Sequence, residues 1–228
     1  MAEFNHPLTL YYFPLRARGE AIRMILNYGG IPFNDVVISM EEWKGIKQRG
    51  ELAPFGQLPC MSLPDGSIIA QSGAIARYAA KLAKVYPEDP MVAAKADMIF
   101  EFAQELNMIS PLLNFWPIST DVWKNNYELF FNNLPRQLSI ADRLLGDQSF
   151  FCGHSPCHGD FALFHVMDAC RTMQADCLNN FPRLAQFMNR TSQLPGVREY
   201  LANRLPPQSV GLCGSYMQVE VAKIHHPK

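Results

Sequence analysis

The chain has 228 residues, a formal net charge of −1 at pH 7, 48% hydrophobic residues and 18% charged residues. That balance is typical of a globular protein with a substantial core, and the length suits one large or two small domains. The near-neutral charge excludes nucleic acids and anionic membranes as main electrostatic partners. No apolar run reaches the length of a membrane span, and residues 1–7 lack the basic and apolar stretches of a secretory signal, so we expect a cytoplasmic protein.

The first third of the chain alternates short strand patterns with helical patterns. In order, we predict a strand at 8–13, a helix over 21–29, a strand at 33–38, a helix at 41–50, strands at 58–63 and 68–70, and a helix from Ser72. The first strand stops at Pro14, because proline cannot donate to a sheet ladder. Asp65-Gly66 favours a tight turn between the last two strands. This β-α-β-α-β-β-α order is a thioredoxin-like arrangement.

The rest of the chain carries helical patterns only. Residues 86–90 break the periodicity and are the expected linker. Beyond it, apolar stripes predict long helices over 99–113 and 123–141 and shorter ones at 159–173, 182–190 and 195–204. We therefore expect an α/β thioredoxin-like N-terminal domain at 1–84 and an all-α C-terminal domain at 90–228.

The six cysteines include no Cys-x-x-Cys pair, which favours free thiols over a disulfide framework. The segment 152–158 carries four potential metal ligands, two cysteines and two histidines. It lacks a second ligand cluster at zinc-site spacing, so a loop that enters a helix is the better interpretation. We expect no metal.

One short motif near the N-terminus points to a chemistry. A strand that carries Tyr12 near its end, followed by two arginines one turn away, places a phenol beside guanidinium groups, which suits an anionic, sulfur-bearing ligand. The motif, which resembles the opening of the cytosolic glutathione S-transferases of the tyrosine type, reads Tyr12-Phe13-Pro14-Leu15-Arg16-Ala17-Arg18-Gly19-Glu20. The resemblance extends over the whole predicted architecture, from residue 8 to about residue 205. It implies an enzyme that adds the glutathione thiolate to small hydrophobic electrophiles, with glutathione as co-substrate and no other cofactor.

The resemblance also implies a glutathione site. Its members are Tyr12, Arg18, Trp43, Lys47, Gln57, Leu58, Pro59, Gln71, Ser72 and Glu105. Pro59 matches the family's cis proline, which leaves the Leu58 backbone free to pair with a peptide; a trans proline at a strand edge is the alternative. Ser72 opens a helix whose N-terminus favours a carboxylate, although by itself it is an N-cap.

The other site residues carry implied roles with ordinary alternatives. Trp43 and Lys47 share a helical face near the glycyl carboxylate of the ligand, or are surface residues. Glu105 stands where the family usually has an aspartate, whose side chain reaches across the dimer to the amino group of the ligand. Arg18 fits the position below the thiol. For Arg16, the alternative to a role in the site is a structural one, in which it pairs with Glu20 one turn further along the helix.

Tyr12 is the expected catalytic residue, assisted by Arg18. Its hydroxyl would donate a hydrogen bond to the thiolate, and Tyr11 points to the opposite face because side chains alternate along a strand. The hydrophobic substrate pocket is expected to be lined by Phe13, Leu15, Met108, Leu112 and Trp116, with the tail after Arg204. The alternative for each is ordinary core packing.

Two further features follow from the resemblance. Phe55 lies where several classes of the family insert an aromatic "key" into a partner subunit, so we expect a homodimer. At the start of the predicted 159–173 helix, the family usually has Ser or Thr three positions before an aspartate, as a capping box. Here Cys157 takes that place before Asp160, and we expect a deficit of about 1 kcal/mol against Ser.

The subclass and two rival functions stay open. Gly56-Gln57-Leu58-Pro59 is similar to the Pi class, whereas the spacing of Trp43 and Lys47 is similar to the Sigma class, which includes glutathione-dependent prostaglandin isomerases. A non-catalytic carrier or lens crystallin of the same family is the alternative from another class. A thiol-disulfide oxidoreductase is disfavoured, because no cysteine lies at the start of the site.

Overall fold

The computed structural model describes residues 7–50, 52–109 and 120–204. In the N-terminal part, the elements are β1 (Leu8–Tyr12), α1 (Ala17–Tyr28), β2 (Phe33–Val37), α2 (Met40–Arg49), β3 (Cys60–Ser62), β4 (Ile68–Ala70) and α3 (Ser72–Leu82). The helical part contains α4 (Pro90–Ile109), α5 (Asp121–Leu145), α6 (His158–Met173), α7 (Pro182–Ser192) and α8 (Val197–Asn203). The β-α-β-α-β-β-α order predicted from the sequence is confirmed, and no strand is assigned after β4 within the described residues.

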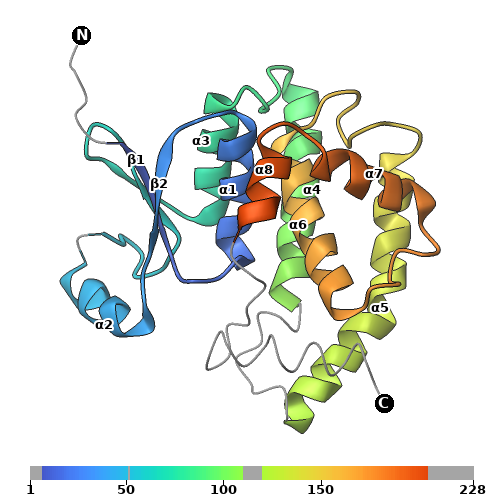
Figure 1. Cartoon of the computed structure of the whole chain (residues 1–228), viewed down its shortest axis with the longest axis horizontal. Coiled ribbons are helices and arrows are strands. Elements are labelled where there is room, and N and C mark those ends of the chain that lie inside the picture. Colours follow the sequence, from blue (N-terminus) through green and yellow to red (C-terminus); the bar gives the residue numbers. More distant parts are fainter. Residues whose placement is uncertain (1–6, 51, 110–119, 205–228) are drawn as a thin grey trace.

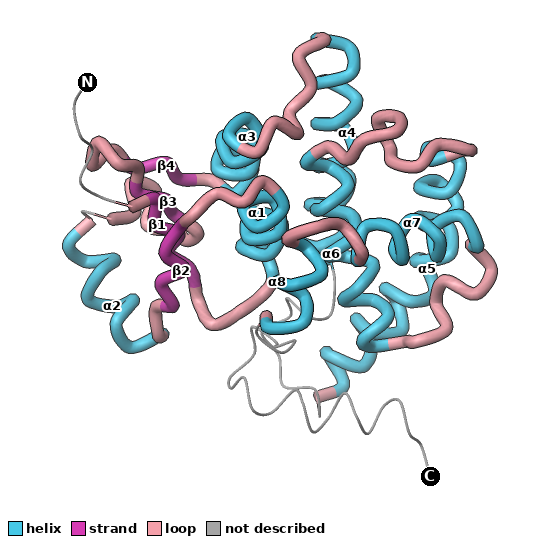
Figure 2. Tube along the Cα trace, turned by 45° about the horizontal axis from the view of Figure 1, so that its top comes forward, coloured by secondary structure: helices cyan, strands magenta, loops and turns pink. Residues whose placement is uncertain are grey.

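The sheet has four strands in the order β2-β1-β3-β4. β1 runs parallel to β2, with Tyr12 opposite Val37, and antiparallel to β3, with Leu10 opposite Met61. β3 and β4 form an antiparallel pair. α1 and α3 cover one face of this sheet and α2 lies on the other side (Figures 1 and 2). This mixed sheet between helices is a thioredoxin-like domain, as the sequence predicts.

Several boundaries differ from the predicted ones for local reasons. β3 begins at Cys60 rather than at residue 58, because Pro59, which lacks a backbone N–H, precedes it. α1 begins at Ala17, four residues before the first apolar position of its stripe. The predicted stripe over 99–113 belongs to α4, and its positions from 110 onward lie outside the described residues.

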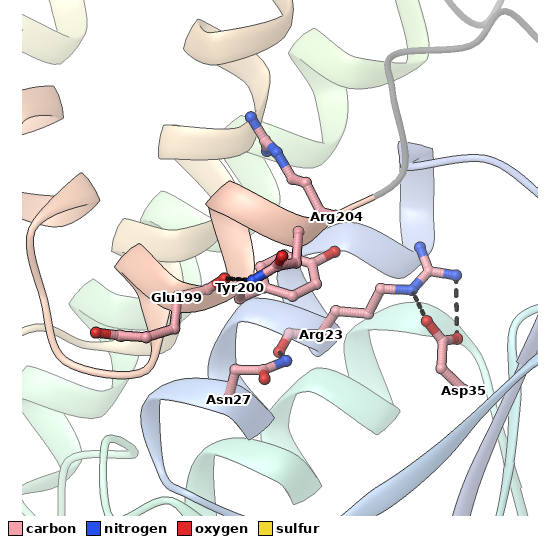
Figure 3. Close-up of a pocket in the computed structure, with 7 residues that line it drawn as sticks. Arg23, Asn27, Asp35, Glu199, Tyr200 and Arg204 are labelled. Atoms are coloured by element: carbon pink, nitrogen blue, oxygen red, sulfur yellow. Dashed lines mark hydrogen bonds and ion pairs between the residues drawn. The ribbon is translucent and has the colours of Figure 1, made fainter.

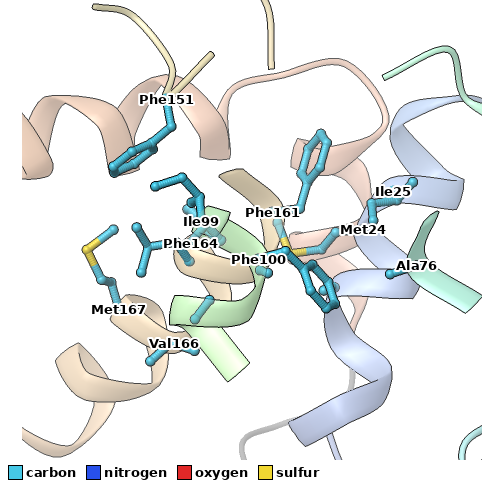
Figure 4. Packing of buried hydrophobic residues seen from close by; sticks show 14 of the residues in the cluster. Met24, Ile25, Ala76, Ile99, Phe100, Phe151, Phe161, Phe164, Val166 and Met167 are labelled. Atoms are coloured by element: carbon cyan, nitrogen blue, oxygen red, sulfur yellow. The ribbon is translucent and has the colours of Figure 1, made fainter. Parts of the chain in front are cut away.

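One hydrophobic core joins the sheet-covering helices to the helical part. Met24 and Ile25 of α1 and Ala76 of α3 lie beside Phe100 of α4 and Phe161 of α6 (Figure 4). All five side chains are buried. Because this apolar core is continuous, α1 is held firmly between the sheet and α6, and the segment that precedes α1 is fixed with it.

α4 and α6 pack at very short range, and glycine makes this possible. A Cβ atom on Gly159, in the first turn of α6, would lie 2.6 Å from the backbone oxygen of Ala96 in α4. His158, beside it, is fully buried, and its Nε2 lies 3.0 Å from Asp97 Oδ1. The start of α6 is therefore seated directly against the middle of α4.

No helix among the described residues is long and apolar enough to cross a membrane.

Candidate functional site

A cavity of about 420 Å³ opens where α1, α2, the segment before β3 and the start of α3 meet. Its lining residues are Phe13, Arg18, Trp43, Phe55, Gly56, Gln57, Leu58, Pro59, Ala70, Gln71 and Ser72. Most of the residues that the sequence predicts for a glutathione site thus come together here, from segments far apart along the chain. The side chains include a guanidinium group, an amide, a hydroxyl and an indole, which together suit a polar ligand with anionic groups.

Tyr12 lies beside this cavity rather than among its lining residues. Its side chain is 5% exposed and packs with Leu15, Trp43 and Leu58. The ring lies close against α1, since a Cβ atom on Gly19 would be 2.8 Å from Tyr12 Cδ1. Phe13, the next residue along the chain, does line the cavity, and the centres of the Tyr12 and Phe13 rings lie 5.7 Å apart.

The electrostatics around Tyr12 keep its phenol protonated. Burial raises the pKa of Tyr12, against the opposing effects of a backbone hydrogen bond from Arg18 and of the positive charges on Arg18 and Arg23. The Arg23 guanidinium carbon lies 5.9 Å from the centre of the Tyr12 ring. With its pKa raised, the phenol keeps its proton and can donate it in a hydrogen bond.

The peptide bond between Leu58 and Pro59 is cis, which confirms the prediction made from the sequence. Both residues are buried and line the cavity. The preceding Gln57 contributes its carbonyl oxygen as the acceptor for the Cys60 thiol, at 3.2 Å. Cys60 is fully buried, and burial raises the pKa of its thiol to about 11, so it is an inert part of this wall.

The N-terminus of α3 faces the cavity through Gln71 and Ser72. Gln71 has φ +72°, in the left-handed region that residues other than glycine rarely adopt, and its side chain is exposed. Ser72, the first residue of the helix, is 6% exposed. The first N–H groups of a helix have no intrahelical acceptors and carry partial positive charge, so this corner of the cavity favours an anion. A strained residue held beside such a corner is a common feature of binding sites.

α2 supplies the opposite wall. Trp43 is 9% exposed, and its ring meets Phe13 edge to face, with centroids 5.8 Å apart. The helix is fixed by a capping box between Ser39 and Glu42. Lys47, four residues after Trp43, is exposed and does not line the cavity; its Cε lies 3.5 Å from the position that a Cβ atom on Gly56 would take.

Of the five residues predicted for a hydrophobic substrate pocket, the structure describes three, and these lie in different surroundings. Phe13 lines the cavity, whereas Leu15 is buried in the cluster around Tyr12. Met108, on α4, is exposed, and its sulfur accepts a hydrogen bond from the Arg18 guanidinium group, which links α4 to the cavity. Leu112 and Trp116 lie outside the described residues.

Two charged residues fall away from the cavity. Glu105 is exposed on α4 and is not among the lining residues. Arg16 forms an ion pair with Asp168 of α6 at 3.6 Å, while the carboxylate of Glu20 accepts hydrogen bonds from Tyr200 and Arg204. Arg16 is therefore tied to α6 through Asp168, a partner that its sequence position did not indicate.

Sequence reasoning missed three lining residues. Phe55 was assigned only to a dimer contact, yet its side chain, 66% exposed, also borders the cavity. Gly56 precedes the Gln57–Pro59 tract, and Ala70 ends β4 directly before Gln71. Proximity to predicted site residues along the chain was the signal that could have found them.

A second cavity, also of about 420 Å³, lies between α1 and α8 and holds none of the predicted site residues. Figure 3 shows its polar lining, in which the Arg23 guanidinium group points to Asp35. These two residues form hydrogen bonds of 2.7 and 3.2 Å, and Arg204 binds Glu20 and Asp168. The cationic groups of this cavity thus have carboxylate partners within the chain, which is typical of a structural network.

Among the residues that the structure describes, no group of three or more His, Cys, Asp or Glu side chains is arranged to hold a metal ion. The 152–158 segment instead forms a turn and the entry to α6.

Family models and known proteins similar to this chain identify its family. The glutathione S-transferase N-terminal domain family matches residues 19–82, and the C-terminal domain family matches residues 115–204. The chain is 32% identical to hematopoietic prostaglandin D synthase of Gallus gallus over 206 residues, covering 88% of this chain and 96% of that protein. It is 30% identical to glutathione S-transferase P of Pongo abelii over 214 residues, covering 90% and 95%.

Among solved structures, the Pi-class glutathione S-transferase of Onchocerca volvulus superimposes with a TM-score of 0.75 at 28% identity, covering 86% of this chain and 93% of that one. Rat hPGDS, solved in complex with a quinoline, gives a TM-score of 0.74 at 26% identity, covering 89% and 98%. With both of its parts matched and its relatives covered almost end to end, the chain belongs to the glutathione S-transferase family.

Proposed function

We propose that this protein is a glutathione transferase that adds the thiolate of glutathione to small hydrophobic electrophiles in the cytoplasm. The observation that carries the proposal is the cavity that joins the N-terminus of α3 to Arg18, Trp43 and the cis Leu58–Pro59 segment, with Tyr12 beside it. Glutathione would serve as co-substrate, without a metal.

Each end of the tripeptide has a matching group. The γ-glutamyl carboxylate would bind at the α3 N-terminus, where the Ser72 hydroxyl adds a donor. The Leu58 backbone would pair with the cysteinyl unit like an added strand, with Gln57 and Pro59 beside it. Trp43 and Lys47 would meet the glycyl carboxylate, and Glu105 would reach the amino group in a partner subunit.

Tyr12 would stabilise the thiolate by donating its phenolic proton as a hydrogen bond. A charge-assisted bond of this kind contributes about 1.5–3 kcal/mol, or roughly one to two units of thiol pKa. Starting from a free thiol near ~8.5, a two-unit shift raises the thiolate fraction at pH 7 about 25-fold. Intrinsic nucleophilicity falls about eightfold over the same shift, so ionisation alone gives only a gain of a few fold.

The larger part of the rate enhancement would therefore come from holding the electrophile against the sulfur. Residues 90–228, the proposed second domain, would supply an apolar pocket beside the glutathione domain at 1–84. The contact between Arg18 and Met108 supports this assignment, because it brings the end of α4 next to the cavity.

A homodimer would complete the site. Phe55 is 66% exposed, and Leu82 of α3 and Met91 and Met98 of α4 are also exposed large apolar side chains. An exposed aromatic side chain such as that of Phe55 is a candidate contact for a partner subunit. Sedimentation of the wild type as a dimer, and of Phe55→Ser as a weaker dimer, is the expected result.

The experiment that tests the transferase proposal is a turnover assay with glutathione and a generic aryl halide. Conjugation that saturates in both substrates supports it. Glutathione binding without any conjugation would favour a non-catalytic carrier or crystallin instead.

A second candidate, glutathione-dependent prostaglandin isomerisation, is favoured by the similarity to hematopoietic prostaglandin D synthase. The same thiolate would attack an endoperoxide. Product analysis with a prostaglandin endoperoxide distinguishes the two: isomerisation at a rate matching aryl halide conjugation would support it, and no isomer above the uncatalysed background would exclude it.

A further inference from the structure

The loop that enters α6 carries two cysteines, and neither of them lines the glutathione cavity. The side chains of Cys152 and Cys157 are close enough for each to shift the pKa of the other's thiol. Cys152 is partly exposed, with its Sγ 3.9 Å from the Val92 carbonyl oxygen, whereas Cys157 is 2% exposed. Both are free thiols. The pair thus combines a partly exposed cysteine with a buried one beside it.

The backbone holds this arrangement in place. One carboxylate group, that of Asp160, accepts hydrogen bonds from the N–H of Phe151 at 2.9 Å and from the N–H of Cys157 at 2.7 Å. Phe151 directly precedes Cys152, so a single buried side chain anchors the chain next to both sulfurs. Between them, Gly153 adopts φ +124° and pairs with Phe150 in an isolated bridge, which turns the segment back on itself.

The surrounding charges give the two sulfurs different characters. The neighbouring Cys157 thiol lowers the pKa of the Cys152 thiol, and the charge of Lys95 lowers it further, against burial and Asp160. The neighbouring Cys152 thiol, burial and the nearby Asp160 carboxylate raise the pKa of Cys157 strongly. Elsewhere in the described residues, burial raises the thiol pKa of Cys60, Cys170 and Cys177. Cys152 is thus the thiolate-forming member of the pair.

We propose that Cys152 and Cys157 form an oxidisable dithiol site whose oxidant is a low-molecular-weight disulfide such as glutathione disulfide. The Cys152 thiolate attacks one sulfur of the oxidant, forms a mixed disulfide and expels one glutathione thiolate. Cys157 then attacks the Cys152 sulfur, closes the intramolecular disulfide and expels the second glutathione, to which its proton passes. The protein loses two electrons and two protons, and one glutathione disulfide becomes two glutathione molecules.

The cross-link would close a short loop onto the first turn of α6, where Cys157 is the N-cap residue. The dithiol site shares no residue with the glutathione cavity, so this proposal does not depend on the proposed transferase activity.

The test is disulfide mapping of the full-length protein after incubation with excess glutathione disulfide. Free thiols are blocked under acid quench, and peptides are read by mass spectrometry. We expect a product lighter by two hydrogen atoms, with Cys152 joined to Cys157. A mixed disulfide that persists at Cys152 without the cross-link, a cross-link between other cysteines, or no reaction overturns the proposal.

Variants separate the two roles. Cys157→Ser should leave Cys152 as a lasting mixed disulfide with glutathione, and Cys152→Ser should give neither product at this loop. Cys177→Ser, which replaces another partly buried thiol, is the matched control and should retain the cross-link. In the unmodified wild type, Cys152 should also be alkylated about tenfold or more faster than Cys177, whose pKa is raised to about 11. Equal or slower alkylation of Cys152 overturns the proposed nucleophile.

Discussion

The guanidinium carbon of Arg23 in α1 lies 5.9 Å from the centre of the Tyr12 ring at the end of β1. On the same helix, a Cβ atom on Gly19 would lie 2.8 Å from Tyr12 Cδ1. The ring is thereby fixed against α1 before any ligand binds, which positions the proton donor that the proposed chemistry needs.

Ser72→Ala tests the proposed carboxylate corner. Loss of the hydroxyl removes one hydrogen bond to a charged group, so we expect KM for glutathione to rise about tenfold. Turnover at saturation should stay close to the wild-type value, because this contact is the same in the ground state and the transition state. Steady-state kinetics with varied glutathione measure both. Ser192→Ala, at the last residue of α7 and not among the lining residues of the cavity, is the control and should change neither constant; an equal fall in kcat and kcat/KM for Ser72→Ala would contradict a purely binding role.

His165→Leu tests the effect of a buried, uncharged imidazole on acid stability. His165 is 5% exposed, and neither ring nitrogen has a hydrogen-bond partner, so burial lowers its pKa from 6.5. A lowered pKa means that the unfolded chain binds the proton more readily than the folded protein does. The contribution of neutral His165 to the free energy of unfolding is therefore fully present above pH 6.5 and is lost as the pH falls below that value.

The wild type should therefore lose up to about 1.4 kcal/mol of unfolding free energy per pH unit below this point, relative to His165→Leu. Denaturant unfolding of both proteins between neutral and mildly acid pH measures the difference. Parallel pH profiles for the two proteins would show that this histidine does not carry the effect.

Gly159→Ala tests the close approach of α6 to α4. The added methyl group would lie 2.6 Å from the backbone oxygen of Ala96, which cannot move aside as a flexible side chain can. We expect a loss of unfolding free energy of about 2 kcal/mol or more, visible as a lower midpoint in denaturant.

Gly45→Ala in α2 is the matched control. The Cβ atom of the new alanine would have Nη1 of Arg49, the end of a flexible side chain, as its nearest neighbour, at 3.3 Å. Because this neighbour can move aside, the better helix propensity of alanine should stabilise the protein by up to about 1 kcal/mol. Equal changes in the free energy of unfolding for Gly159→Ala and Gly45→Ala would show that the close approach of the helices at Gly159 does not determine the stability at this site.

Local patterns predicted much of the fold. Strand alternation and helical stripes gave the order of elements through α3, because each of these segments buries one face in a regular way. The cis bond before Pro59 was anticipated from a short motif, and the residues around that motif do meet in one cavity. Their roles in binding and catalysis stay predictions.

Long-range pairings were beyond local patterns. The partner of Arg16 is Asp168, which lies on α6, and nothing in the spacing of either residue indicated this ion pair. The same holds for the contact of Arg18 with Met108 and for the charged network between α1 and α8. Such contacts depend on how whole helices pack, which is decided by the shared core around Phe100 and Phe161.

The most direct test of the central claim is the titration of the enzyme-bound glutathione thiol, followed by the ultraviolet absorbance of its thiolate, in the wild type and in Tyr12→Phe. We expect an apparent thiol pKa about one to two units below the free value of ~8.5 in the wild type, and a return toward that value in the variant. The turnover of Tyr12→Phe should fall most at acid pH, with glutathione affinity little changed. An unchanged thiol pKa in Tyr12→Phe, with turnover at the wild-type level across the pH range, would contradict the account.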